Sequence, residues 1–221
     1  LAGDLNIDGS IGSHTAHLRA GYEDLPQHTG TAYRDEAGVR DHVAACALAG
    51  VQSGFHVIGD AGMDIVLAGY EAAARLVGWH TVRRTRPRLE HAEMVDAAGV
   101  RLMGRLGMVA SVQPAFDALW GGTEGMYAAR LGPERGLATN PYRRMLDAGV
   151  TLALGSDSPV TPFAPWQAVR ACVEHRDESQ RLDVATALAA HTSGGWTAAR
   201  MERAGVLRVG GPATFAAWRV G

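Results

Sequence analysis

Five short apolar runs alternate along the chain with segments that have helical periodicity. The runs lie near Leu5–Ile7 and at Val51–Ile58, Pro87–Glu90, Gly107–Val112 and Val150–Leu154. Short apolar runs that are bounded by Gly or Pro are typical of buried strands. Strands that alternate with helices form parallel sheets with crossover helices, so the predicted fold class is α/β.

The segments between and after these runs are expected to be helices, because their apolar residues recur on one face. They are Glu36–Ala49, Met63–Leu76, Val95–Leu106, Pro141–Ala148, Pro165–His175 and Val184–His191. Two segments have a different pattern. Residues Ala115–Thr139 are predicted to be a long loop, and Gly205–Gly221 to be two short strands around a Gly-Gly-Pro turn.

Composition narrows the class of protein further. The 221 residues carry a net charge of −2, with 47% hydrophobic and 20% charged residues, as expected for one globular domain or one and a fraction. We expect no nucleic-acid partner, because there is no basic excess, and no membrane partner, because no apolar run approaches about 18 residues. Cys46 and Cys172 are predicted to be buried thiols of a reducing compartment, which favours a cytoplasmic location.

The chain has no lysine, since all 21 basic residues are Arg. A Schiff-base lysine, a P-loop lysine and a metal bridge built on a carboxylated lysine are therefore excluded for this chain.

Each predicted strand ends in a polar side chain. These residues are Asp8, His56, His91, Gln113 and Asp157. In a parallel α/β barrel the carboxyl ends of the strands form the mouth where catalytic groups converge. Imidazole and carboxylate groups are natural ligands of Zn²⁺ and similar ions, and a metal with an open position activates water.

A single histidine at a strand end is more often hydrogen-bonded than metal-bound. Taken alone, each of these histidines therefore has a structural role as the alternative to metal binding. The other seven of the nine histidines are expected to be mostly solvated, with His42 and His175 facing outward on helices. Only the joint pattern indicates a metal site.

Six short motifs, spread over nearly the whole chain, occur in the same order as in a known protein family. They are Asp8–Ala16 (DGSIGSHTA), Phe55–Asp60 (FHVIGD), Arg88–Ala92 (RLEHA), Ala110–Pro114 (ASVQP), Leu154–Val160 (LGSDSPV) and Gly205–Gly210 (GVLRVG). With them the sequence resembles the amidohydrolase superfamily, specifically amidohydrolase family 3, which includes enzymes similar to N-substituted formamide deformylase.

The resemblance implies a distorted (β/α)₈ TIM-type barrel with a divalent metal at its mouth, Zn²⁺ first and Fe²⁺ or Mn²⁺ as alternatives. It implies that His56 and His91 end strands five and six, and that Asp157 ends strand eight as metal ligand and proton shuttle. Water activated by the metal would attack an amide-like carbonyl, and Asp157 would pass the proton to the leaving nitrogen. Residues 1–204 would form strands four to eight, and residues 205–221 the start of a small β segment.

The sequence departs from the family pattern in two places. The His-x-His pair of the first strand occurs nowhere in the chain, and Asp4 stands where many relatives have Lys. A dinuclear centre with a carboxylated lysine is therefore excluded. A mononuclear site remains, in which His56 and Asp157 would join the missing pair while His91 binds the substrate or the attacking water.

The expected substrate is a small amide-like molecule whose non-peptide C–N bond is hydrolysed. Gln113, Phe116 and Trp120 are the candidate substrate-binding residues, with Tyr127 as a further apolar wall. Two alternatives stay open: a catalytically inactive half-barrel that acts as a scaffold, and a deaminase of the same superfamily. A homo-oligomer is also possible.

Overall fold

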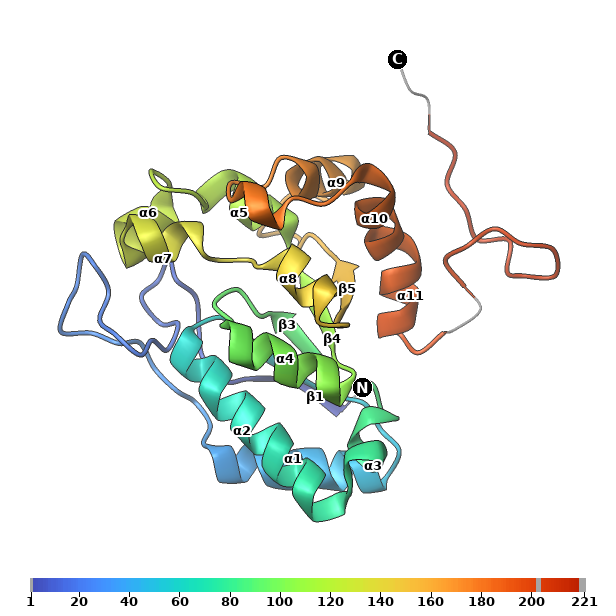
Figure 1. The fold of residues 1–221 in the computed structure, drawn as a ribbon, viewed down its shortest axis with the longest axis horizontal. Helices are drawn as coiled ribbons and strands as arrows, with labels where there is room; N and C mark the ends of the chain where they lie inside the picture. Colours follow the sequence, from blue (N-terminus) through green and yellow to red (C-terminus); the bar gives the residue numbers. More distant parts are fainter. Residues whose placement is uncertain (1, 202–203, 219–221) are drawn as a thin grey trace.

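The computed structural model describes residues 2–201 and 204–218 and contains one five-stranded parallel sheet (Figure 1). The strands are β1 (Ala2–Asn6), β2 (Ser53–Val57), β3 (Arg88–His91), β4 (Val109–Val112) and β5 (Thr151–Leu154). Their order in the sheet is their order in the chain. The α/β fold class and all five predicted strands are confirmed.

The register of the sheet aligns the carboxyl ends of neighbouring strands. Asn6 pairs with His56, and Val57 pairs with His91. At the other side of the sheet Val112 pairs with Leu154. The residues that follow these positions therefore emerge along one edge, which is where the polar strand ends were expected to meet.

Helices connect the strands, and the predicted ones form within a few residues of the expected bounds. The helices of the first half are α1 (Glu36–Leu48), α2 (Asp60–Val77), α3 (Trp79–Arg83) and α4 (Ala97–Leu106). Those of the second half are α8 (Tyr142–Asp147), α9 (Pro165–Val173), η1 (Glu178–Gln180), α10 (Val184–Ala189), the π-helical turn η2 (Ala190–Gly194) and α11 (Gly195–Ala198). In Figure 1, α1, α2 and α3 gather on the β1–β2 side and α9, α10 and α11 on the β5 side.

The main core lies between the sheet and its covering helices. Phe55 and Leu89 from adjacent strands are fully buried, as is Met103 of α4. Tyr70 of α2 is also fully buried, and its hydroxyl group is paired with the Ser53 hydroxyl at 2.9 Å. This pairing satisfies a polar atom that would otherwise destabilise an apolar interior. Both thiols, Cys46 and Cys172, are buried and free.

The segment predicted to be a long loop, Ala115–Thr139, instead contains three short helices. They are α5 (Pro114–Trp120), α6 (Met126–Leu131) and α7 (Pro133–Leu137). Proline stands in the first turn of α5 and of α7, where its missing N–H group costs nothing. Glycines between these helices interrupt the helical pattern in the sequence, so the sequence did not predict where they begin.

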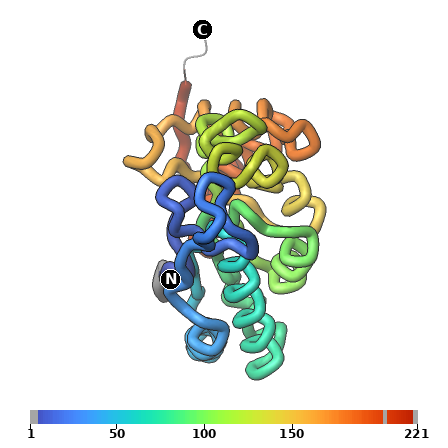
Figure 2. The backbone as a smooth tube through the Cα atoms, turned by 90° about the vertical axis from the view of Figure 1, so that its left-hand side faces the viewer, coloured from blue at the N-terminus to red at the C-terminus, as the bar shows by residue number. Residues whose placement is uncertain are grey.

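The tail does not form the two predicted strands in the part that the structure describes. Residues 204–218 contain no helix or strand, and Leu207 and Val209 are exposed. An isolated two-stranded hairpin is marginally stable at best, because it has no sheet or helix on which to bury its apolar face. The chain runs away from the body here (Figure 2), and Trp218 contacts Trp166 of α9 with ring centroids 5.9 Å apart. The domain boundary after residue 204 stays a prediction.

None of the helices formed by the described residues combines the length and the apolar character needed to cross a bilayer.

Substitution of Gly59 by alanine is expected to lower the free energy of unfolding by about 1–3 kcal/mol, measured by chemical denaturation. A Cβ atom at Gly59 would lie 2.1 Å from the carbonyl oxygen of His17. That oxygen accepts a hydrogen bond from the Gly62 amide, so it cannot move away without losing the bond. The matched control is Gly195→Ala, whose Cβ would meet no described atom within 4 Å. Equal losses in the two variants would contradict this packing.

Candidate active site

Two imidazole rings pack against each other at the carboxyl edge of the sheet. His56 lies in β2 and His91 ends β3, and their ring centroids are 4.5 Å apart at an interplanar angle of 67°. The Nδ1 atoms of both rings are buried and have no hydrogen-bond partner among the described residues. Buried polar atoms without a partner are uncommon in folded proteins, so this pair is available for a ligand.

The backbone at His91 is strained, and its ring is held neutral. His91 and Ala92 both have left-handed backbone angles, with φ of +69° and +51°. Such angles are costly for residues other than glycine and concentrate at functional sites. Burial lowers the pKa of His91 to about 3; the neighbouring His56 adds to the decrease, whereas Gln113 opposes it. A neutral imidazole is the form that binds metal ions.

Asp8 is a structural anchor beside this pair. Its side chain is 0% exposed and accepts hydrogen bonds from the backbone amides of His17, Ile58 and Gly59 at 2.8–2.9 Å. Burial raises the pKa of Asp8, and these hydrogen bonds counteract the increase. Oδ1 of Asp8 lies 3.9 Å from Nδ1 of His56. Asp8 therefore fixes the loop after β1 onto the end of β2 beside His56, and its oxygens are already occupied by backbone donors.

Asp157 does not join the two histidines in one ligand group. It is exposed, has a left-handed φ of +53°, and its carbonyl oxygen accepts a hydrogen bond from the Val160 amide. This tight turn directs the segment after β5 away from the strand. Among the residues that the structure describes, no three His, Cys, Asp or Glu side chains are arranged to hold a metal. The expected grouping of His56, His91 and Asp157 around one ion is not formed here, and their individual roles stay predictions.

The candidate substrate-binding residues lie next to His91. Phe116 of α5 stacks on the His91 ring with centroids 5.8 Å apart and planes at 23°. Trp120 lies one helical turn further along α5, and its ring contacts the Phe116 ring with centroids 4.7 Å apart. Gln113 is buried between β4 and α5, and its Nε2 donates to the Ser111 carbonyl oxygen at 3.4 Å. These contacts place all three close to the histidine pair, and contact with substrate stays a prediction.

Glu93 and His175 are buried polar residues near the site whose burial the sequence did not predict. Glu93 follows His91 by two residues, and burial raises its pKa to about 7, while the Tyr127 hydroxyl and Asn140 favour the charged form. The alternating pattern of β3 ends before Glu93, so no periodicity marked it. His175 was expected to face outward on a helix; it is instead fully buried, and its Nε2 lies 3.0 Å from the Asn140 carbonyl oxygen. Helix α9 ends at Val173, so the helical face used for that prediction does not extend to His175.

The two imidazoles fit a divalent transition metal in part. Zn²⁺, Fe²⁺ and Mn²⁺ bind neutral imidazole nitrogen atoms, and the partnerless ring nitrogens of His56 and His91 provide such donors. A catalytic zinc site has three protein ligands, and the described residues place two donors side by side.

Comparison with known proteins gives one family. The model of the Amidohydrolase family matches residues 1–220. The chain is 34% identical to Protein LONG AFTER FAR-RED 3 of Arabidopsis thaliana, over 76% of this chain and 28% of that protein. It is 32% identical to N-substituted formamide deformylase of Arthrobacter pascens, over 64% of this chain and 26% of that protein. It is also 26% identical to Putative amidohydrolase YtcJ of Bacillus subtilis, over 85% of this chain and 36% of that protein.

A solved structure with the same fold is an uncharacterized metal-dependent hydrolase of Pyrococcus furiosus. The TM-score is 0.78 at 26% identity, covering 91% of this chain and 40% of that one. The chain thus spans between a quarter and two fifths of the length of these relatives. The matches confirm the resemblance drawn from the sequence motifs, and the chain belongs to the amidohydrolase family.

Proposed function

We propose that this chain contributes the catalytic edge of a metal-dependent hydrolase that cleaves non-peptide C–N bonds of small amide-like substrates. The observation that carries the proposal is the packed pair of His56 and His91, whose buried ring nitrogens have no partner among the described residues. Family membership and the fold shared with a metal-dependent hydrolase support the same reaction class.

Each residue has a distinct part in the proposal. His56 and His91 would hold the divalent metal, Zn²⁺ first, and the buried carboxylate of Asp8 lies 3.9 Å from Nδ1 of His56, where its charge would favour a bound cation. When bound, a metal of this kind lowers the pKa of water and polarises a carbonyl group. Asp157 would take a proton from the attacking water and give it to the leaving nitrogen, so that the C–N bond breaks with a neutral amine as product.

The name of one relative supports a substrate class for this proposal. One of them is named N-substituted formamide deformylase, which makes N-substituted formamides the first compounds to assay. Phe116 stacks on His91 and would cover the side of the site where the amide enters.

Replacing either histidine by alanine is expected to weaken Zn²⁺ binding at least about tenfold, measured by competition with a chelator of known affinity. The matched control is His80→Ala, because His80 is exposed on α3 and should leave the affinity unchanged. Unaltered Zn²⁺ affinity in both His56→Ala and His91→Ala would disprove this ligand assignment.

Asp157→Asn is expected to lower kcat for formamide hydrolysis by about 10²–10⁴-fold, because asparagine cannot accept and return the proton. Asparagine tolerates the left-handed backbone at this position, so the fold should be retained. Equal kcat for the variant and the unaltered protein would rule out proton transfer by Asp157.

Two other results would identify the alternative functions. A metal-bound protein without turnover indicates a scaffold, and ammonia release from a ring substrate indicates a deaminase.

A further inference from the structure

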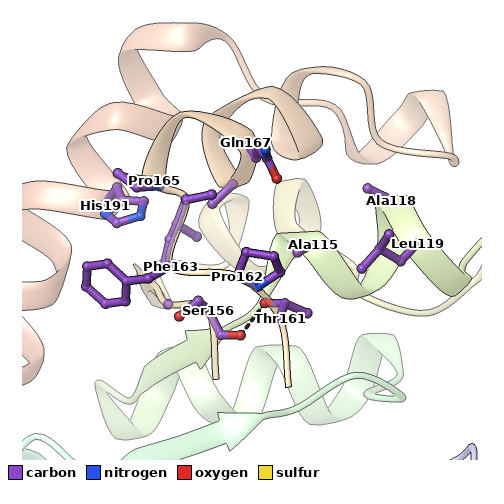
Figure 3. A pocket seen from close by; sticks show the side chains of 14 residues that line it. Ala115, Ala118, Leu119, Ser156, Thr161, Pro162, Phe163, Pro165, Gln167 and His191 are labelled. Carbon is purple, nitrogen blue, oxygen red and sulfur yellow. Dashed lines mark hydrogen bonds between the residues drawn. The ribbon is translucent and has the colours of Figure 1, made fainter. Parts of the chain in front are cut away.

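An apolar pocket lies at the carboxyl end of β5, beside α5 and α9 (Figure 3). Its volume is about 310 Å³. One wall is formed by α5, another by the loop of residues 155–164, and a third by the first turns of α9. His191, from the π-helical turn η2, completes the lining.

The lining carries no fixed charge that a charged ligand could use. Among the described residues that line the pocket, none is Asp, Glu or Arg. The Thr161 hydroxyl donates to the Ser156 carbonyl oxygen, so this polar group is already used (Figure 3). Gln167 and His191 are the other polar side chains besides Ser156. A charged group in the pocket would lose hydration without gaining a counter-ion, whereas an apolar group would gain by leaving water.

Helix α5 links this pocket to the histidine pair. Ala115, Ala118 and Leu119 share one helical face and line the pocket. Phe116 and Trp120, one turn apart, form the aromatic contact with His91. The loop on the opposite wall contains Asp157, which follows the lining residue Ser156 directly. The pocket is therefore bounded by the same two segments that carry the proposed substrate contacts and the proposed proton donor.

We propose that this pocket binds the uncharged apolar substituent of the substrate, an alkyl or aryl group at least as large as one aromatic ring. The size follows from the volume, because a cavity of about 150 Å³ is sufficient for benzene. Phe163 lines the pocket beside His191 and is 86% exposed, so its ring is free to close over this substituent (Figure 3). The inference rests on the proposed function, since it names the part of the amide substrate that is recognised.

The test is direct binding of N-ethyl-, N-butyl- and N-hexylformamide to the 221-residue chain, measured by NMR titration. Affinity is expected to rise about fourfold for each added methylene group until the pocket is full. A cationic analogue, N-(6-ammoniohexyl)formamide, is expected to bind at least tenfold more weakly than the N-hexyl compound. Affinity that is independent of chain length, or equal affinity for the cation, would overturn the proposal.

Two variants assign the binding to this pocket. Ala118 is exposed on α5, so Ala118→Leu fills the pocket without disturbing the core, and it should weaken N-hexyl binding at least tenfold. The same substitution at Ala45, exposed on α1 outside the pocket, should leave the affinity unchanged. Gln167→Glu places a carboxylate at the pocket and should strengthen binding of the cationic analogue. Unchanged N-hexyl affinity in Ala118→Leu would overturn the assignment.

Hydrolysis of the same series is the second readout and separates the two proposals. Binding with the expected dependence on chain length, but without hydrolysis by the metal-loaded protein, would contradict the proposed function and support the pocket as a binding site. Hydrolysis at rates that do not depend on chain length would overturn the pocket assignment and support the proposed function.

Discussion

The parallel register of the sheet is the constraint on which the candidate site depends. Val57 is paired with His91 and His56 with Glu90, so the two strands end at nearly the same level. The left-handed backbone at His91 ends the alternation of β3, and its ring lies 4.5 Å from the His56 ring. The buried contacts of Phe55 and Leu89 with the covering helices hold this register in place.

A buried carboxylate fixes the position of the loop after β1 against the sheet. Asp8 ties the loop after β1 to the end of β2 through three backbone amides, so these two segments are joined beside His56. A buried charge is costly, and its three amide hydrogen bonds offset part of that cost. Gly59 and Gly62 make the arrangement possible, because a Cβ atom at either position would collide with His17 or Asp8. The backbone contacts of Asp8 and the close packing at Gly59 and Gly62 thus support the histidine pair from below.

The sequence was sufficient for the strands and the longer helices, and for the His56–His91 pair. Each β-strand is a short apolar run, and the pair follows from two strand ends in a parallel sheet, so local patterns carry that information. The sequence was insufficient at Asp157, because its placement depends on a left-handed turn that no periodicity marks. It was also insufficient at His175 and in the tail, where burial and strand pairing depend on distant partners. The apolar pocket is likewise assembled from α5, β5, α9 and η2, and only the tertiary structure brings these segments together.

X-ray absorption spectroscopy of the chain loaded with one equivalent of Zn²⁺ tests the central claim most directly. The account predicts imidazole scattering from two histidines, with Zn–N distances of about 2.0–2.1 Å, and the loss of one imidazole in His56→Ala. A coordination shell made only of oxygen, unchanged by that substitution, would contradict it.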